Sequence, residues 1–317
     1  MKGTYICPFF AIYFYKNAER KDKGYSMSEA QSIQWFPGHM SRTKRQLEKY
    51  LKQVDAVAEI IDARIPVSSR NPDLNRMIQQ KPRIILLNKS DMADSEATKE
   101  WIKLFQEQNV KAIPMDCKSG NGLRAFQPAV RQILAPRMAA WQRKGMVGRT
   151  IRVMVVGVPN VGKSSFINKL SHGSHAVVED RPGVTRTNQW FPVDKDFDLL
   201  DTPGVLWPKF DNKIVGEHLA FTGAVKDNVF DTESLAARLL ELICKLYPNA
   251  VCNRFKLADT DFSGMEGWQI LELVGRKRGM LVSGGEIDME RASIMVLDEF
   301  RAGKIGRITL ERVGETL

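Results

Sequence analysis

A chain of 317 residues, 43% of them hydrophobic and 26% charged, is long enough for about two domains with sizeable cores. This balance is ordinary for a globular protein and excludes the fibrous and disordered classes, while a net charge of +10 favours a polyanionic partner. The four cysteines form no Cys-x-x-Cys pair, which predicts reduced thiols in a cytoplasmic protein and no zinc site.

Residues 1–26 differ in character from the rest of the chain. Their apolar run, Ile6–Tyr15, is too short to span a bilayer, which takes roughly 20 residues. The residues that follow it are charged and contain no small-residue cleavage site. We expect a dispensable, non-conserved or artefactual extension, a natural start at Met27, and no membrane partner.

Strand-like and helix-like segments alternate over residues 27–208. A basic helix is predicted at Met40–Lys52, and the apolar runs that follow predict strands. These strands are Val54–Ile61, Arg83–Leu87, Val110–Met115 and Ile151–Val156. Helical patterns separate them at Pro72–Gln80, Ser95–Gln108 and Leu123–Leu134. The alternation predicts an α/β domain with a mostly parallel, six-stranded sheet, in which a hairpin of Trp190–Val193 and Phe197–Leu200 adds an antiparallel edge.

The tail, residues 209–317, is predicted to be a small all-α domain. Apolar residues recur at helical spacing in Thr232–Leu246 and Glu286–Arg301, and Gly264–Arg276 is expected to form a third helix.

The tetrapeptide Asn88-Lys89-Ser90-Asp91 follows one of the predicted strands. The Asp91 carboxylate can accept two N–H bonds from guanine that adenine cannot supply, and adenine would leave it unpaired. Asn88 is expected to tie loops together, and the stem of Lys89 to lie across the base. Cys117 and Lys118 follow the next strand, where GTPases place a base-supporting Ser-Ala-Lys loop, although only Lys118 coincides with that pattern.

The strand Ile151–Val156 leads directly into a glycine-rich loop, Gly157–Ser164, that opens a helix. In this context the loop predicts a phosphate site, since its N–H groups and the helix N-terminus face the anion. A plain glycine turn is the alternative. Lys163 is expected to bridge the β- and γ-phosphates in catalysis, and the Ser164 hydroxyl to bind Mg²⁺. The nucleotide-binding residues of this loop are predicted to be Asn160, Val161, Gly162, Lys163, Ser164 and Ser165.

A γ-phosphate sensor is predicted at Asp201-Thr202-Pro203-Gly204, at the end of the hairpin's second strand. Asp201 would hold Mg²⁺ through water, and the Gly204 N–H would contact the γ-phosphate and act in catalysis. Between the two loops, Thr185 is the expected switch threonine that binds Mg²⁺ and nucleotide, with an ordinary loop threonine as the alternative.

The order of these motifs differs from that of the usual GTPase, in which the phosphate loop comes first. With Trp35–Met40, they make residues 33–313 resemble the circularly permuted GTPases of ribosome assembly, most closely the bacterial ribosome biogenesis GTPase A group. The resemblance implies a Ras-like P-loop domain that hydrolyses GTP to GDP and phosphate. It further implies binding to the precursor of the large ribosomal subunit during late assembly, with hydrolysis driving release. Because the sensor leads directly into the helical tail, a change between the GTP-bound and GDP-bound states is expected to reorient the tail.

Hydrolysis is expected to be slow and ribosome-stimulated, because Val205 occupies the place of the glutamine that orients water in signalling GTPases. His39 is our candidate for the missing group; a structural role in packing is the alternative. Asn160 matches the asparagine with which potassium-dependent GTPases coordinate K⁺, and a plain loop residue is the alternative.

Three basic segments are candidate rRNA contacts: Arg42–Lys52, Arg137–Arg152 with Trp141, and Gly275–Gly279. Charge runs are often only solvated faces. A GTP-gated adaptor that binds a protein partner through its helical tail remains the alternative function, and an ATP-dependent enzyme is a more distant one. We expect a monomer in solution.

Overall fold

The structure is a computed structural model that describes residues 45–78, 81–146, 148–171, 189–204, 206, 212–225, 229–257 and 260–315. The extension 1–26, the segment Trp35–Met40 with His39, and also Thr185 and Val205, lie outside the described residues.

Six strands form one sheet in the order β3-β2-β1-β4-β6-β5. The strands are β1 (Ala56–Asp62), β2 (Arg83–Asn88), β3 (Lys111–Pro114), β4 (Ile151–Val156), β5 (Gln189–Asp194) and β6 (Phe197–Asp201). All neighbouring pairs are parallel except β5 and β6, which form the antiparallel edge. The predicted six-stranded, mostly parallel sheet is confirmed.

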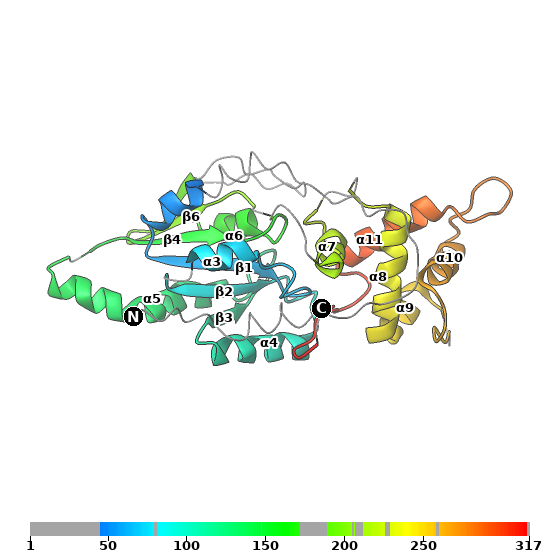
Figure 1. The fold of residues 1–317 in the computed structure, drawn as a ribbon, viewed down its shortest axis with the longest axis horizontal. Coiled ribbons are helices and arrows are strands. Elements are labelled where there is room, and N and C mark those ends of the chain that lie inside the picture. Colours follow the sequence, from blue (N-terminus) through cyan, green and yellow to red (C-terminus); the bar gives the residue numbers. More distant parts are fainter. Residues whose placement is uncertain are drawn as a thin grey trace.

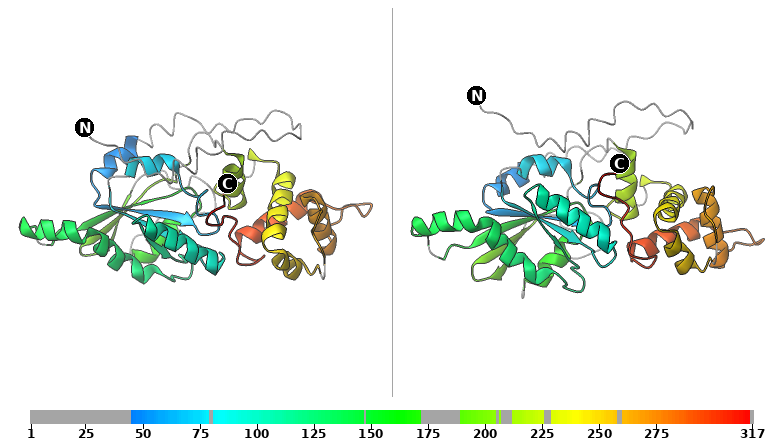
Figure 2. Two further views of the ribbon diagram at one scale, coloured as in Figure 1. Left: turned by 60° about the horizontal axis from the view of Figure 1, so that its bottom comes forward. Right: turned by 90° about the horizontal axis from the view of Figure 1, so that it is seen from below.

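Helices cover both faces of this sheet (Figure 2), and the strand sequences explain why. All seven residues of β1 are buried, and alternate side chains point to opposite faces. Ala56, Ala58 and Ile60 pack with α5 (Phe126–Arg143) and α6 (Lys163–Leu170). Side chains of the other face pack against the helix of residues 45–51, α3 (Pro72–Ile78) and α4 (Ser95–Glu107). A short 3-10 turn, η1 (Leu123–Ala125), precedes α5.

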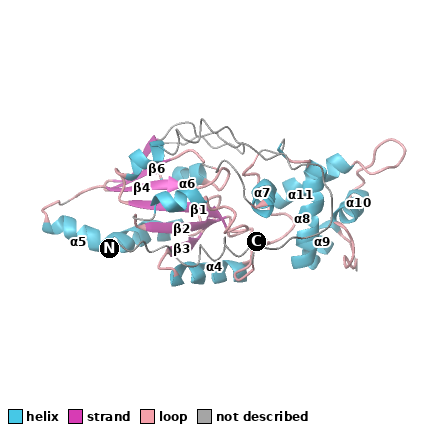
Figure 3. Ribbon diagram, in the orientation of Figure 1, coloured by secondary structure: helices cyan, strands magenta, loops and turns pink. Residues whose placement is uncertain are grey.

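Beyond one end of the sheet, the described residues of the second half of the molecule form a group of helices (Figures 1 and 3). They are α7 (Lys213–Phe221), α8 (Thr232–Leu246), α9 (Pro248–Phe255), α10 (Gly267–Lys277) and α11 (Met289–Arg301). Asp231 and Asp288 cap the N-termini of α8 and α11 by accepting backbone N–H bonds. None of the described helices is long and apolar enough to cross a membrane.

After α11, residues 304–313 run back onto the sheet domain beside α4; we call them the C-terminal strap (Figure 1). Glu311, only 2% exposed, anchors the strap. It accepts bonds from the backbone and hydroxyl of Ser68 and lies 2.9 Å from Nδ1 of His218 in α7. Its backbone carbonyl also accepts the indole N–H of Trp101 at 2.9 Å.

Candidate functional site

The predicted motifs meet at the carboxyl edge of the parallel strands. Asn88 ends β2 and pairs in register with Asp62, the last residue of β1. The phosphate loop follows β4, and Val155 of β4 pairs with Asp201 at the end of β6. Loops far apart in sequence are therefore neighbours, as expected at a ligand-binding edge of an open α/β sheet.

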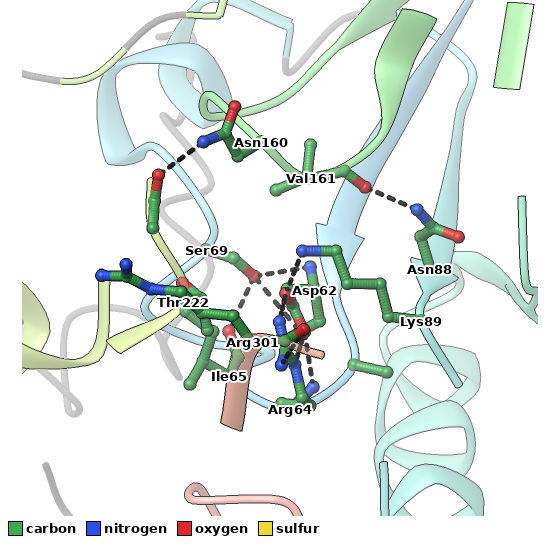
Figure 4. A network of polar contacts seen from close by, with 12 residues as sticks. Asp62, Arg64, Ile65, Ser69, Asn88, Lys89, Asn160, Val161, Thr222 and Arg301 are labelled. Atoms are coloured by element: carbon green, nitrogen blue, oxygen red, sulfur yellow. Dashed lines mark hydrogen bonds and ion pairs between the residues drawn. The ribbon is translucent and has the colours of Figure 1, made fainter. Parts of the chain in front are cut away.

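Asn88 hydrogen-bonds to two other loops, and Figure 4 shows its bond to the phosphate loop. Its Nδ2 donates to the carbonyl of Val161 in the phosphate loop at 2.6 Å, and its Oδ1 accepts the N–H of Cys117 at 2.9 Å. Gly162 makes this approach possible, since a Cβ there would lie 2.3 Å from the Asn88 amide. Its φ of +99° also favours glycine. The Asn88 side chain thus fixes the predicted base-reading loop relative to the phosphate loop.

The other residues that are predicted to read the base have different surroundings. We define the base loop as residues 88–94. Asp91, within this loop, and Lys118, outside it, are both exposed. Lys89, with a φ of +60°, places its ammonium 3.0 Å from Oδ2 of Asp62. Burial, with a smaller contribution from the charge of a neighbouring aspartate, raises the pKa of the Cys117 thiol to about 12, so this residue supports the loop through its backbone.

Lys163 lies at the start of α6 and is buried. Its Nζ donates to the carbonyl of Val158 at 2.8 Å, within the loop itself. Burial lowers the pKa of the ammonium to about 8, and the charge of Asp201 opposes part of that effect. The charge of Asp201 only partly offsets the burial of this ammonium, and bound phosphates would supply the further negative charge that stabilises it.

The sensor packs directly on the phosphate loop. A Cβ on Gly204 would lie 2.9 Å from the backbone of Pro159 and 3.1 Å from Nζ of Lys163, so only glycine fits without a shift. The Thr202 hydroxyl donates to the carbonyl of Val155 at 2.6 Å and fixes the end of β6 beside β4.

Mg²⁺ fits the residues at this edge by donor chemistry. Asp201 is a buried carboxylate and Ser164 a half-buried hydroxyl in the first turn of α6, and oxygen ligands of this kind suit Mg²⁺. Such sites take few protein ligands, because the substrate phosphates complete the coordination. The half-buried Ser165 follows in the same turn.

Asn160 connects the phosphate loop to the helical half of the molecule. Its Nδ2 donates to the carbonyl of Gly223, just after α7, at 2.6 Å (Figure 4). Arg301 at the end of α11 donates to the carbonyls of Ala220 and Phe221 at the end of α7, at 2.9 and 3.3 Å. A K⁺ role for Asn160 depends on its amide oxygen and remains a prediction.

Two functional candidates, Asp62 and Arg64, did not follow from the sequence motifs. Both are 1% exposed, and the guanidinium of Arg64 donates two hydrogen bonds to the Asp62 carboxylate, at 2.8 and 3.0 Å. Burial favours the neutral form of Asp62, but the charges of Arg64 and Lys89 outweigh it and lower the pKa of this carboxyl. The sequence signal that could have identified Asp62 is a carboxylate at the end of a run of buried strand residues, as at Asp201.

Comparisons with known proteins agree with this geometry. Residues 152–246 match the family described as 50S ribosome-binding GTPase. The chain is 43% identical to Ribosome biogenesis GTPase A of Bacillus cereus, with 88% of this chain and 93% of that protein covered. It is 31% identical to the mouse Mitochondrial ribosome-associated GTPase 1, with 88% and 90% covered.

A solved structure is also similar. GNP-bound YlqF from Thermotoga maritima matches with a TM-score of 0.61 and 30% identity, over 86% of this chain and 99% of that one. The permuted order of the motifs, the sheet that unites them and these relatives lead to one conclusion. The chain is a GTPase and belongs to the ribosome biogenesis GTPase A family.

Proposed function

We propose that the protein is cytoplasmic and, in its GTP-bound state, docks on an immature large ribosomal subunit, promotes late assembly, and is released by hydrolysis. The observation that carries this proposal is the 43% identity over nearly the whole length of a protein named Ribosome biogenesis GTPase A. The joined base, phosphate and sensor loops support it, since they provide the parts of a guanine-nucleotide switch.

A cationic pocket of about 220 Å³ supports contact with rRNA. Four cations line it around a single carboxylate, that of Asp55. Three come from two of the predicted basic segments, and the fourth lies two residues before β2. The cations are Lys52, Lys81, Arg137 and Arg149. The pocket lies at the amino ends of the strands, opposite the nucleotide edge, because Asp55 directly precedes β1.

Protein groups hold these cations in place. Lys81 donates to the carbonyl of Val54 at 2.7 Å, and Arg137 to that of Asp55 at 3.0 Å. Arg149 pairs with the Asp55 carboxylate at 2.8 Å and lies 4.1 Å from the centre of the Trp141 ring. Burial and then the charge of Arg137 lower the pKa of Lys81, as expected where positive charge accumulates. A phosphodiester backbone would relieve this repulsion.

The basic cluster at the end of α10 is a weaker candidate than the pocket, because carboxylates pair with its arginines. Arg276 pairs with Glu272 at 3.0 Å, and Arg278 lies 3.4 Å from Glu299 and over the ring of Phe255. Lys277 is exposed. We therefore place the principal rRNA contact at the pocket and a weaker one at α10.

Slow intrinsic hydrolysis, with stimulation by the ribosome, completes the proposal. Val205 cannot orient water, so His39 is proposed to do so when the subunit is bound, with K⁺ beside Asn160 as a further aid.

The test is co-sedimentation with ribosomal particles in a GTP-analogue and a GDP state, together with GTP turnover in the presence of subunits. The protein should co-sediment with the particles more strongly in the GTP-analogue state than in the GDP state, and subunits should raise the rate of GTP turnover. Turnover that is unaffected by subunits would favour the adaptor alternative. Replacing Arg137 by Gln should flatten the salt dependence of binding by about one unit of slope. Lys103→Gln, which removes an exposed cation of α4 outside the three basic segments, is the matched control.

A further inference from the structure

The C-terminal strap hydrogen-bonds to the backbone of the base loop. Arg307 donates from Nε to the carbonyl of Ala93 at 3.0 Å and from Nη2 to that of Ser90 at 3.1 Å. The N–H of Ile308 donates to the carbonyl of Met92 at 2.9 Å. Three carbonyls of one short loop are thus bound by a segment more than 200 residues away in sequence.

The far end of the base loop is fastened to the strap as well. Asp94, the N-cap of α4, donates its N–H to Oγ1 of Thr309 at 3.1 Å. Its carboxylate lies 2.9 Å from Arg312 and 3.1 Å from the hydroxyl of Tyr247, the C-cap of α8. The loop therefore contacts both the strap and the helical domain at this point.

The near end of the loop reaches α11 through a buried relay (Figure 4). The Lys89 ammonium pairs with Asp62, and Asp62 is held in turn by Arg64. The remaining donor of Arg64, Nη1, bonds to the carbonyl of Phe300 in the last turn of α11 at 3.0 Å. A shift of α11 would consequently act on Lys89 through two ion pairs.

From these contacts we infer that the C-terminal strap is a positioning element for guanine recognition. It holds the base loop in the geometry that binds the nucleotide, and displacement of the helical domain loosens the nucleotide. Arg307 is the positioning residue on which this depends most directly. The inference rests on the assignment of Asn88–Asp91 as the base reader, and it does not require ribosome binding. Linkage makes the effect reciprocal, so a bound nucleotide also stabilises the docked position of the helices.

The experiment measures release of a fluorescent GDP analogue from purified Arg307→Ala. Loss of two carbonyl contacts should accelerate release on the order of fivefold. KM for GTP should rise while turnover at saturating GTP stays unchanged, which a general loss of structure would not produce. Arg307→Lys, which keeps the charge and can reach one carbonyl, should restore part of the effect.

Lys304→Ala is the matched control, because it removes an exposed cation of the same strap. Equal release rates for the wild type and Arg307→Ala would overturn the inference, as would an equal acceleration in Lys304→Ala. An Asp91→Asn variant that keeps its guanine preference would instead show that the base-loop assignment itself is wrong.

Discussion

Nucleotide binding is expected to take up a proton at Lys163 when the pH is close to 8. Burial lowers the pKa of this ammonium from 10.5 to about 8, despite the charge of Asp201. At ~1.4 kcal/mol per pH unit, roughly 3 kcal/mol opposes the charged form in the nucleotide-free protein. Bound phosphates supply negative charge and raise the pKa again. Since about half of the free protein is neutral at Lys163 at pH 8, binding should take up ~0.5 proton.

The stability of the nucleotide-free protein should respond to the same group. The pKa of Lys163 is lower in the folded protein than in the unfolded chain, so the unfolded chain binds more protons between pH 8 and 10.5. Stability therefore gains from this group as the pH rises through that window, and the full cost of burying the charge is present below pH 8.

Isothermal titration of GDP in buffers with different ionisation enthalpies measures the proton uptake. The slope of observed enthalpy against buffer enthalpy should give ~0.5 proton at pH 8 and ~0.1 at pH 7. Slopes near zero at both pH values would refute the reasoning, because they would mean that Lys163 is fully charged before the phosphates arrive.

Three further predictions concern other residues of the site. Asp91→Asn should lower GDP affinity on the order of a hundredfold and shift the preference towards xanthosine nucleotides, as measured by competition binding. His39→Ala should lower subunit-stimulated turnover at least about tenfold without changing GTP affinity, and normal stimulated phosphate release would exclude His39. If K⁺ binds beside Asn160, hydrolysis is faster in KCl than in NaCl at equal ionic strength; equal rates count against it.

The sheet could be predicted from sequence because its strands carry a local signal. Short apolar runs that end in loop residues located all six strands to within about two residues. The helices α7 and α9 escaped prediction: α9 has only eight residues and begins at Pro248, directly after α8. Helix α5 continues nine residues past its predicted end at Leu134, through Pro136. There the packing of Met138 and Trp141 against the core favours a continued helix.

The residues of the site also differ in whether the sequence alone could identify them. The phosphate loop and the sensor are contiguous motifs on strand ends, so their residue types identify them. The pair of Asp62 and Arg64, in contrast, could be recognised only from its contacts in the fold. Asp62 pairs with Lys89, which follows a neighbouring strand, and Arg64 bonds to Phe300, 236 residues further along the chain. No local pattern encodes that contact, nor the bonds that Arg307 makes to the base loop.

The contacts of the helical half divide the nucleotide site into a base side and a phosphate side. The strap holds the base loop, whereas Gly223 binds Asn160 of the phosphate loop. GTP and GDP present the same base, so the strap contacts change the affinity for both alike and cannot distinguish them. Any change in the helices between the GTP-bound and GDP-bound states must therefore be transmitted from the phosphate side of the site, through Asn160 or through the chain that follows Gly204. Displacement of the helices by a partner acts on both sides, which makes nucleotide release the step that such a partner would control most directly.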